Sequence, residues 1–550
     1  MKVLLYGCPL KIYLCKITGM KRLIIITIIL LIATVLVTIV YFKNLNTATE
    51  HTSQVLRAIP NNASLILEFN NEKGFYDIFA NNQLFTNIIG EDKMTELKVL
   101  KKVVLLNPVI EPYLHGQNVY ISLHPQKGNN IDFLITIAVP KGFEPELFNE
   151  LSKQKKNGIV LNTFNIDSQQ GYVIYLNDLK RRFYLISKDD HSLSGSFSKE
   201  LIETCAKYDY QKEKQAFVLL SDRQNSNSLA NLYINYSALS PLFEQIFVNK
   251  NTDLFKSFRQ LPAFAALSLN YKTDALMFNG TTQLQNNQSD AYLGLFSAQE
   301  PVINHIKNIF PSTTAYSTNF GISDPEKFES DLVDLETKGS FKNERSAIIG
   351  KIKKETGMVL KKEFSKLLSN EFAAITTRYH EKIAIVQVKD GSKMQALLTN
   401  ISKMNTDRSG QFNYEKVPQI LLGDAFNIFK RPYFKIFDNY LVLTNSLSEL
   451  TSYDDSYNNR KFLNRTDGYS QFDALLAEKS NVTFFIHFKN AQQLFKEDMK
   501  PQFYDAFENM LPGWKNFYAA ACQFNSSDKN YYTNFCVRLN SDTTAVKSNF

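Results

Sequence analysis

The stretch IPNNASLILEF, residues 59–69, decides the fold, because a similar stretch recurs in the second half of the chain. Residues 310–320 read FPSTTAYSTNF and keep the order of a proline, a short polar turn, an alanine and an extended run that ends in phenylalanine. The two final phenylalanines, Phe69 and Phe320, lie about 250 residues apart, and self-similarity at a fixed offset is the first sign of an internal repeat.

Further segments match at nearly the same offset and in the same order along the chain. The matched segments are residues 114–121 with 368–375, 135–139 with 383–388, 150–153 with 400–403, 198–201 with 447–450, 232–239 with 483–491, and 279–284 with 534–539. Any one match could arise by chance, but their common order and offset predict a tandem duplication of one structural unit.

Each half alternates runs typical of strands with shorter helical runs. Residues 119–123, 133–139, 183–186, 217–220 and 263–271 are rich in β-branched and aromatic residues, as expected of strands. Residues 94–104 instead carry apolar residues every three or four positions, which is typical of one helix face. Because short polar loops such as 125–130 link neighbouring strands, we predict an α+β fold with mainly antiparallel sheets.

An apolar run near the N-terminus predicts a membrane span. Residues 23–42 read LIIITIILLIATVLVTIVYF without a charge, and at 1.5 Å per residue such a helix crosses a hydrocarbon core of about 30 Å. The charged residues before it are all positive, which places the N-terminus in the cytoplasm. A cleaved signal peptide is the alternative, but residues 41–46 contain no small-x-small cleavage site.

The predicted fold class is α+β, with an N-terminal transmembrane helix followed by two tandem, duplicated, mainly antiparallel sheet-plus-helix units. Its parts are a cytoplasmic tail (1–22, with Met20 as an alternative start), the transmembrane helix (23–42), a linker (43–54), and α+β units at 55–300 and 301–550. The predicted location is the cell membrane, single-pass, with the N-terminus cytoplasmic and the bulk of the chain extracytoplasmic, in the periplasm.

Composition and charge exclude several classes of protein. Hydrophobic residues make up 44% and charged residues 21%, which is ordinary for a globular chain. The formal net charge is +8, but six basic residues lie at or before position 43; without them, 56 Lys+Arg face 54 Asp+Glu. A nearly neutral body offers no clustered basic face for phosphates, so nucleic acid is excluded as a partner.

The histidines show no spacing typical of a metal or catalytic site. They are His51, His115, His124, His191, His305, His380 and His487. No two of them form an HExxH or HxxxH pair that would face one metal ion from a helix, so we interpret them as surface residues.

Other chemistry-bearing residues receive structural interpretations. Ser194-Gly195-Ser196 is interpreted as a helix-capping turn, since its counterpart in the repeat, residues 443–445, lacks the glycine. The pairs Asp189-Asp190 and Asp454-Asp455 are interpreted as solvated loop carboxylates, and Trp514 as a core plug or loop anchor. The sequence therefore predicts no catalytic, cofactor-binding or metal-ligating residue, and no cofactor.

The anchor, the loosely spaced Pro-x-x-x-Ala start (Pro60 to Ala63, Pro311 to Ala315), and the helix that leads into an apolar strand carry a resemblance. In these features the chain resembles a family of membrane-anchored bacterial envelope proteins that is defined by a domain of unknown function. The resemblance implies a repeated α+β unit outside the membrane and implies no catalytic residues.

Two classes of function remain open. The leading one is a non-enzymatic, single-pass envelope protein that binds or scaffolds a partner outside the membrane: another envelope protein, a lipid or the cell-wall polymer. The alternatives are a membrane-anchored hydrolase whose Ser, Asp and His converge only in the fold, and a lipid- or hydrophobic-ligand-binding protein with a long apolar groove between its halves.

Cys522 and Cys536 lie on the two strands of an expected final hairpin. A turn centred on Lys529 would place them opposite one another, near the separation that a disulfide needs. A shift of one residue would place the two thiols on opposite faces of the sheet. We predict two buried, reduced cysteines rather than a disulfide.

Overall fold

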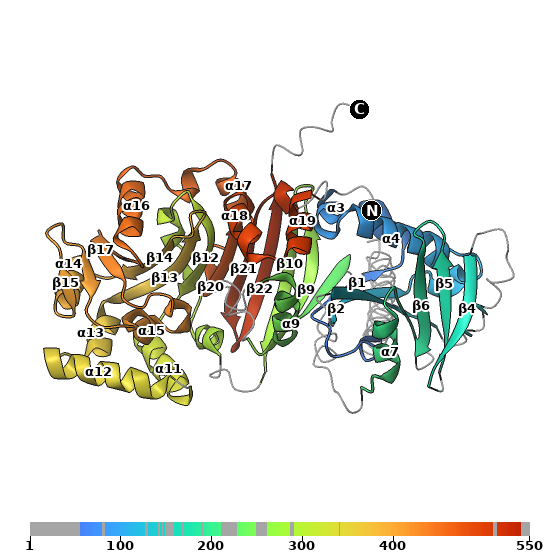
Figure 1. Ribbon diagram of the computed structural model, residues 1–550, viewed down its shortest axis with the longest axis horizontal. Coiled ribbons are helices and arrows are strands. Elements are labelled where there is room, and N and C mark those ends of the chain that lie inside the picture. The colour runs from blue at the N-terminus through green and yellow to red at the C-terminus, as the bar shows by residue number, and fades with distance from the viewer. Residues whose placement is uncertain are drawn as a thin grey trace, which may run out of the picture.

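The computed structural model describes residues 55–540, apart from 80–82, 127–129, 141–142, 146, 149–158, 168, 189–190, 211–227, 249–260, 286–290, 340 and 510–513. Within these ranges, twenty strands form one continuous antiparallel sheet, with helices packed along it (Figure 1). Two short strands, β11 (Val302–Ile303) and β19 (Lys479–Ser480), form a separate antiparallel pair.

The first half contains ten strands of the large sheet. They are β1 (Leu65–Asn70), β2 (Asn118–Gln126), β3 (Asn130–Ala138), β4 (Ile159–Ile166), β5 (Gln169–Leu176), β6 (Arg181–Lys188), β7 (Ser192–Ser196), β8 (Ala230–Asn235), β9 (Ala263–Tyr271) and β10 (Ala275–Leu284). The helices between them are α2 (Lys73–Phe79), α3 (Gln83–Ile89), α4 (Glu91–Leu100), the π-helical turn η1 (Lys101–Leu105), α5 (Glu111–Leu114), α7 (Lys199–Lys207), η3 (Tyr236–Ala238) and α9 (Leu239–Ile246).

The second half contributes the other ten strands. They are β12 (Thr314–Gly321), β13 (Leu368–Thr377), β14 (Lys382–Val388), β15 (Ser402–Met404), β16 (Gly410–Phe412), β17 (Tyr433–Phe437), β18 (Tyr440–Thr444), β20 (Val482–His487), β21 (Phe517–Ser527) and β22 (Asn530–Leu539). The helices are η5 (Tyr292–Ala298), η6 (Ile306–Ile309), α11 (Pro325–Lys338), α12 (Lys342–Thr356), α13 (Leu360–Leu367), α14 (Gly391–Thr399), α15 (Val417–Leu422), η7 (Asp424–Phe426), α16 (Leu447–Asn458), η8 (Leu463–Arg465), α17 (Tyr469–Asp473), α18 (Phe488–Asp498), α19 (Pro501–Asn509) and η9 (Trp514–Asn516).

The same order of strand pairing occurs in both halves. In the first half the strands pair in the order β4-β5-β6-β7-β3-β2-β1-β8-β9-β10. In the second they pair in the order β15-β16-β17-β18-β14-β13-β12-β20-β21-β22. Phe69 and Phe320 lie on β1 and β12, which hold the same place in the two orders.

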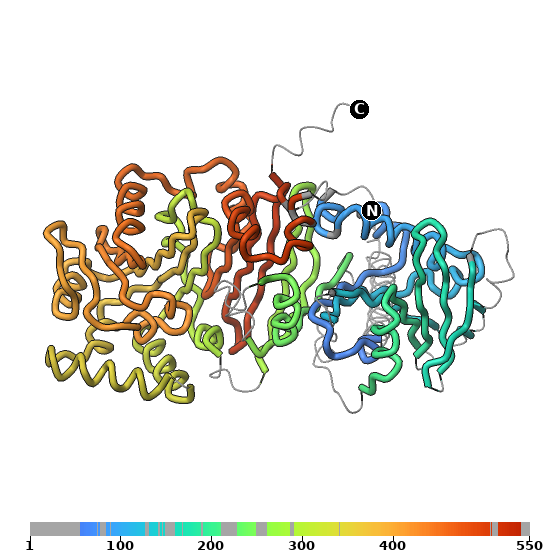
Figure 2. Tube along the Cα trace, in the orientation of Figure 1, coloured from blue at the N-terminus to red at the C-terminus, as the bar shows by residue number. Residues whose placement is uncertain are grey.

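The last strands of the two halves join them into one sheet. β10 pairs with β22 in antiparallel register from Ala275 opposite Arg538 to Thr282 opposite Tyr531. The hydroxyls of Thr282 and Thr533 lie 2.6 Å apart across this joint. Figure 2 shows the joint in the middle of the molecule, with the first half on one side and the second half on the other.

The predicted fold class of a transmembrane helix followed by two tandem sheet-plus-helix units is wrong. Each half ends in a strand whose outer edge has free hydrogen-bonding groups, and such edges pair when they meet. The pairing of β10 with β22 therefore gives one large antiparallel sheet with helices in place of two units in a row.

The helices that the structure describes do not support a membrane span either. Among them, none combines the length and the apolar character that crossing a bilayer requires. The longest, α12, has only 15 residues, about 22 Å, and carries charges throughout (KNERSAIIGKIKKET). The predicted span, residues 23–42, lies outside the described residues. The lack of a membrane-crossing helix among the described residues contradicts the predicted single-pass location at the cell membrane.

Local sequence signals explain where the helices begin. The hydroxyl oxygen of Ser198 accepts a hydrogen bond from the Leu201 N–H at the start of α7. Ser446 and Glu449 form a reciprocal capping box at the start of α16. Since α7 and α16 follow the matching strands β7 and β18, equivalent helices begin with the same kind of cap.

The final hairpin places the two cysteines on opposite faces. Cys522 lies opposite Phe535, and Cys536 lies opposite Ala521, so the register is shifted by one residue from the one that a disulfide needs. Both thiols are free, and burial raises the pKa of each to about 12. The prediction of two reduced cysteines is confirmed.

Alkylation under denaturing conditions without reductant is expected to block all three cysteines of the described region, Cys205, Cys522 and Cys536, because each is a free thiol. Intact-mass measurement followed by peptide mapping checks this result. Recovery of a peptide pair joined through Cys522 and Cys536 would contradict the hairpin register.

Candidate functional site

One face of the first-half sheet forms an apolar floor. Side chains alternate between the two faces of a strand, so Leu67 and Phe69 of β1 point to the same side. Because β2 pairs with β1 in register, Val119 and Ile121 extend this surface, and Ile135 of β3 continues it. These residues all line one cavity.

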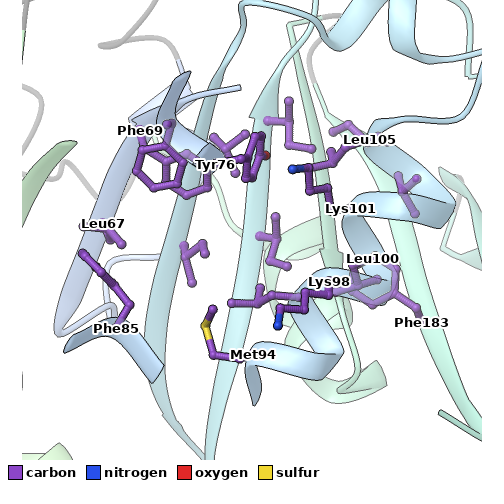
Figure 3. Close-up of a pocket in the computed structure, with 18 of the residues that line it drawn as sticks. Leu67, Phe69, Tyr76, Phe85, Met94, Lys98, Leu100, Lys101, Leu105 and Phe183 are labelled. Atoms are coloured by element: carbon purple, nitrogen blue, oxygen red, sulfur yellow. The ribbon is translucent and has the colours of Figure 1, made fainter. Parts of the chain in front are cut away.

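Three helices and a π-helical turn form the roof of the cavity (Figure 3). Helix α2 contributes Tyr76, α3 contributes Phe85, and α4 contributes Met94. At the end of α4 the Leu106 N–H donates to the Lys101 carbonyl at 2.9 Å, five residues back, which defines the π-helical turn. Such turns are frequent at functional sites, and this one brings Lys101, Val104 and Leu105 into the lining.

The cavity has a volume of about 150 Å³ and adjoins a second cavity of the same size. The two share Leu67, Leu97, Leu100, Ile121, Ile135 and Phe183, so they adjoin on the same face of the sheet. An apolar cavity of roughly this size stays dry and accepts a small apolar molecule.

The two ends of this joint space differ in charge. At one end the Lys101 Nζ lies 3.4 Å from the centroid of the Tyr76 ring, and the exposed Lys98 lies one turn away on α4. Burial lowers the pKa of Lys101, and the nearby Asp77 opposes this effect. At the other end Glu96 pairs with Lys93 at 2.8 Å and with Arg181.

The equivalent face of the second half is filled with aromatic rings. Phe372 of β13 takes the place of Val119, since Phe372 pairs with Phe320 as Val119 pairs with Phe69. The Phe372 ring centroid lies 5.2 Å from that of Phe320, 5.4 Å from that of Phe328 and 5.6 Å from that of Phe426. The duplicated position is therefore hollow in the first half and solid in the second.

The opposite face of the first-half sheet carries a closed polar network around Glu68. This carboxylate is 4% exposed and accepts hydrogen bonds from the hydroxyls of Tyr120 (2.7 Å) and Tyr233 (2.6 Å). It also accepts from the side-chain amides of Asn118 and Asn231. Because both carboxylate oxygens are used, the network holds three neighbouring strands together rather than opening to a ligand.

The surface interpretation of the histidines is confirmed for His115, His305 and His380, which are exposed. It is wrong for His124 and His487, which are 0% and 8% exposed and lie on strands β2 and β20. His191 is half-buried, and His51 lies outside the described residues. Both imidazoles lie on the core-facing side of their strands, because side chains alternate between the two faces of a strand. The spacing rules for metal sites do not take this alternation into account.

His124 lies between Ser122 and Asn62 in a chain of hydrogen bonds. Its Nε2 lies 2.8 Å from the Ser122 Oγ, and its Nδ1 lies 2.8 Å from the Asn62 Oδ1. Since an amide oxygen can only accept, the proton of the neutral imidazole is on Nδ1. The order Ser–His–Asn resembles that of a catalytic triad, but Ser122 and His124 are both fully buried, so no substrate reaches the hydroxyl.

The remaining sequence candidates are structural. Ser194 and Ser196 lie in the buried strand β7, not in a turn, and Ser198 supplies the helix cap instead. Asp454 and Asp455 lie on helix α16 rather than in a loop, and they pair with Lys435 at 2.8 Å and Lys461 at 2.9 Å.

Two of the sequence candidates are not covered. The pair Asp189-Asp190 and the side chain of Trp514 lie outside the described part of the chain. Across the ranges that are described, no three His, Cys, Asp or Glu side chains gather in a group that could hold a metal ion.

Comparisons with known proteins do not assign the chain to a family. No protein-family profile and no curated protein matches it. A solved structure titled "Structure of crystal form III of TP0453" aligns over 46% of this chain and 89% of its own, with 14% sequence identity and a TM-score of 0.21. The predicted resemblance to envelope proteins stays a prediction.

Proposed function

We propose that the chain is a non-enzymatic binding protein that holds an apolar ligand in the first-half cavity. The observation that carries this proposal is the hollow between the α2–α4 helices and the sheet, at the place where the second half packs phenylalanine rings. The site lies within the first half, whereas the lipid-binding alternative predicted from the sequence had a groove between the halves. Of the partners expected from sequence, a lipid fits this lining best.

The energetics favour an occupant. Leu67, Phe69 and Ile135 expose apolar surface to the cavity and gain contacts only when a ligand fills it. Burying apolar surface contributes about 25 cal/mol per Å², so a chain of several methylene groups binds without any directed hydrogen bond. A ligand that binds the folded chain stabilises it in turn by mass action.

Val119→Phe in the full chain is expected to weaken binding of the apolar fluorophore N-phenyl-1-naphthylamine at least about tenfold. The variant puts a phenylalanine ring into the cavity, as the second half does with Phe372 at the matching position. Fluorescence titration measures the dissociation constant for the parent chain and the variant, and both carry the same N-terminal apolar run.

Val160→Phe is the matched control, because Val160 is 52% exposed on β4 and makes no part of the cavity lining. We expect it to bind the fluorophore like the parent chain. Equal binding by Val119→Phe and Val160→Phe would overturn the proposed site.

A further inference from the structure

We infer, on the basis of the function proposed above, that the ligand is a single-chain amphiphile with an anionic head, bound with its tail in the apolar space and its head at Lys98 and Lys101. The ligand class follows from two separate observations: the shape of the apolar space and the difference in charge between its ends.

The shape of the space favours one chain. The two cavities share six lining residues and therefore adjoin, so a ligand that fills both extends from one into the other. Each cavity is about 150 Å³, a size that takes one small apolar group across its width. Between the two ends, the shared lining is apolar throughout, and a polar group placed there would lose its hydrogen bonds to water.

The end of the space at Glu96 is electrically balanced, and its Lys93 and Arg181 side chains are 38% and 44% exposed. Glu96 is 14% exposed at its side chain and pairs with both Lys93 and Arg181, while Asp132 also lines this end. The Arg181 guanidinium lies over the Phe197 ring with its centre 4.2 Å from the centroid. With each cation matched by a carboxylate, an anionic head gains little there.

The end at Lys98 and Lys101 carries positive charge: Asp77 lies near Lys101, but among the described residues no carboxylate lies at ion-pair distance from either lysine. Lys98 and Lys101 are one turn apart on α4 and η1, so their ammonium groups belong to the same rim. The Tyr76 ring holds the Lys101 ammonium over the cavity by a cation–π contact. Figure 3 shows Lys101 beside Tyr76, with Lys98 further along the same helical segment.

Lysine ammonium groups bind carboxylates and phosphates as compact point charges, so both heads share the chemistry that this rim recognises. The head type is therefore resolved by comparing laurate with dodecyl phosphate. Dodecanol has the same tail without the charge and reports on the apolar space alone.

The test is displacement of N-phenyl-1-naphthylamine from the full chain by these three ligands. We expect the better of laurate and dodecyl phosphate to bind roughly tenfold or more tightly than dodecanol. The double variant Lys98→Met, Lys101→Met keeps the apolar stems and removes the charges, so it should lose this preference while binding dodecanol unchanged. Raising the salt concentration should shrink the preference in the parent chain.

The control is the double variant Lys353→Met, Lys354→Met, which makes the same charge change at two exposed positions of α12 in the second half. It should keep the full preference for the anion. If dodecanol binds as tightly as both anions, or if the two double variants behave alike, the charged rim has no such role and the inference is overturned while the apolar site stands. If none of the three ligands displaces the fluorophore from the cavity, the proposed function fails as well.

Discussion

Lowering the pH from 7 to 4 is expected to reduce the free energy of unfolding by about 3 kcal/mol at each of two buried histidines, His124 and His487. Burial lowers the pKa of His124 to about 3, and burial together with Lys489 lowers that of His487 to about 4. Both imidazoles titrate near 6.5 when the chain unfolds. Below that pH the unfolded chain takes up protons at these imidazoles that the folded chain does not, so the contribution of each histidine to stability is complete above pH 6.5 and is lost as the pH falls toward 4.

Urea unfolding at several pH values between 4 and 7 measures this loss. His124→Leu removes one of the two groups, so between pH 7 and pH 4 it should lose about 3 kcal/mol less than the parent chain, whatever its stability at pH 7. His380→Leu is the control, because that side chain is 44% exposed, and it should keep the slope of the parent chain. A His124→Leu profile as steep as that of the parent would show that the buried imidazole does not resist protonation.

Phe372→Ala is expected to lower the free energy of unfolding by about 3–5 kcal/mol, a large fraction of the stability of a typical domain. Phe372 is fully buried, and its ring contacts the rings of Phe320, Phe328 and Phe426. Truncation leaves a cavity in the middle of this aromatic cluster, which the surrounding rings fill only in part.

The matched change in the first half, Val119→Phe, should not lower the free energy of unfolding. Val119→Phe adds a ring where space already exists, so we expect the free energy of unfolding to stay level or to rise. Denaturant titration of both variants gives the comparison. A loss at Val119→Phe as large as that at Phe372→Ala would mean that the first-half cavity cannot accept a ring.

Much of the strand pattern follows from local sequence. The run at residues 263–271 coincides with β9, and the helical periodicity at 94–104 coincides with α4 and the turn after it. The joint between the halves has no such local signal. It depends on hydrogen bonds between β10 and β22, and any strand with a free edge offers the same backbone groups.

The cavity could not be predicted from the sequence, because it arises where side chains are too small to fill the space between the sheet and its helices. Val119 alone is an ordinary apolar strand residue, and the sequence match to Phe372 gains meaning only when both are seen on the same face of equivalent sheets. A position-by-position comparison of side-chain volume between the two repeats is the signal that could have found it. Catalytic spacings, by contrast, concern polar groups, and this site is lined mainly by apolar side chains.

The joint between β10 and β22 also has a symmetry. Asn279 and Asn534, which match in the sequence repeat, lie directly opposite one another in the paired strands. Each half therefore presents the same edge to the other, as the two subunits of an isologous dimer do. Carrying both partners in one polypeptide makes the contact intramolecular, so it forms at any dilution. The two halves also need not keep identical sequences, as two copies of one subunit must. The first half therefore has a cavity at the place that phenylalanine rings fill in the second half.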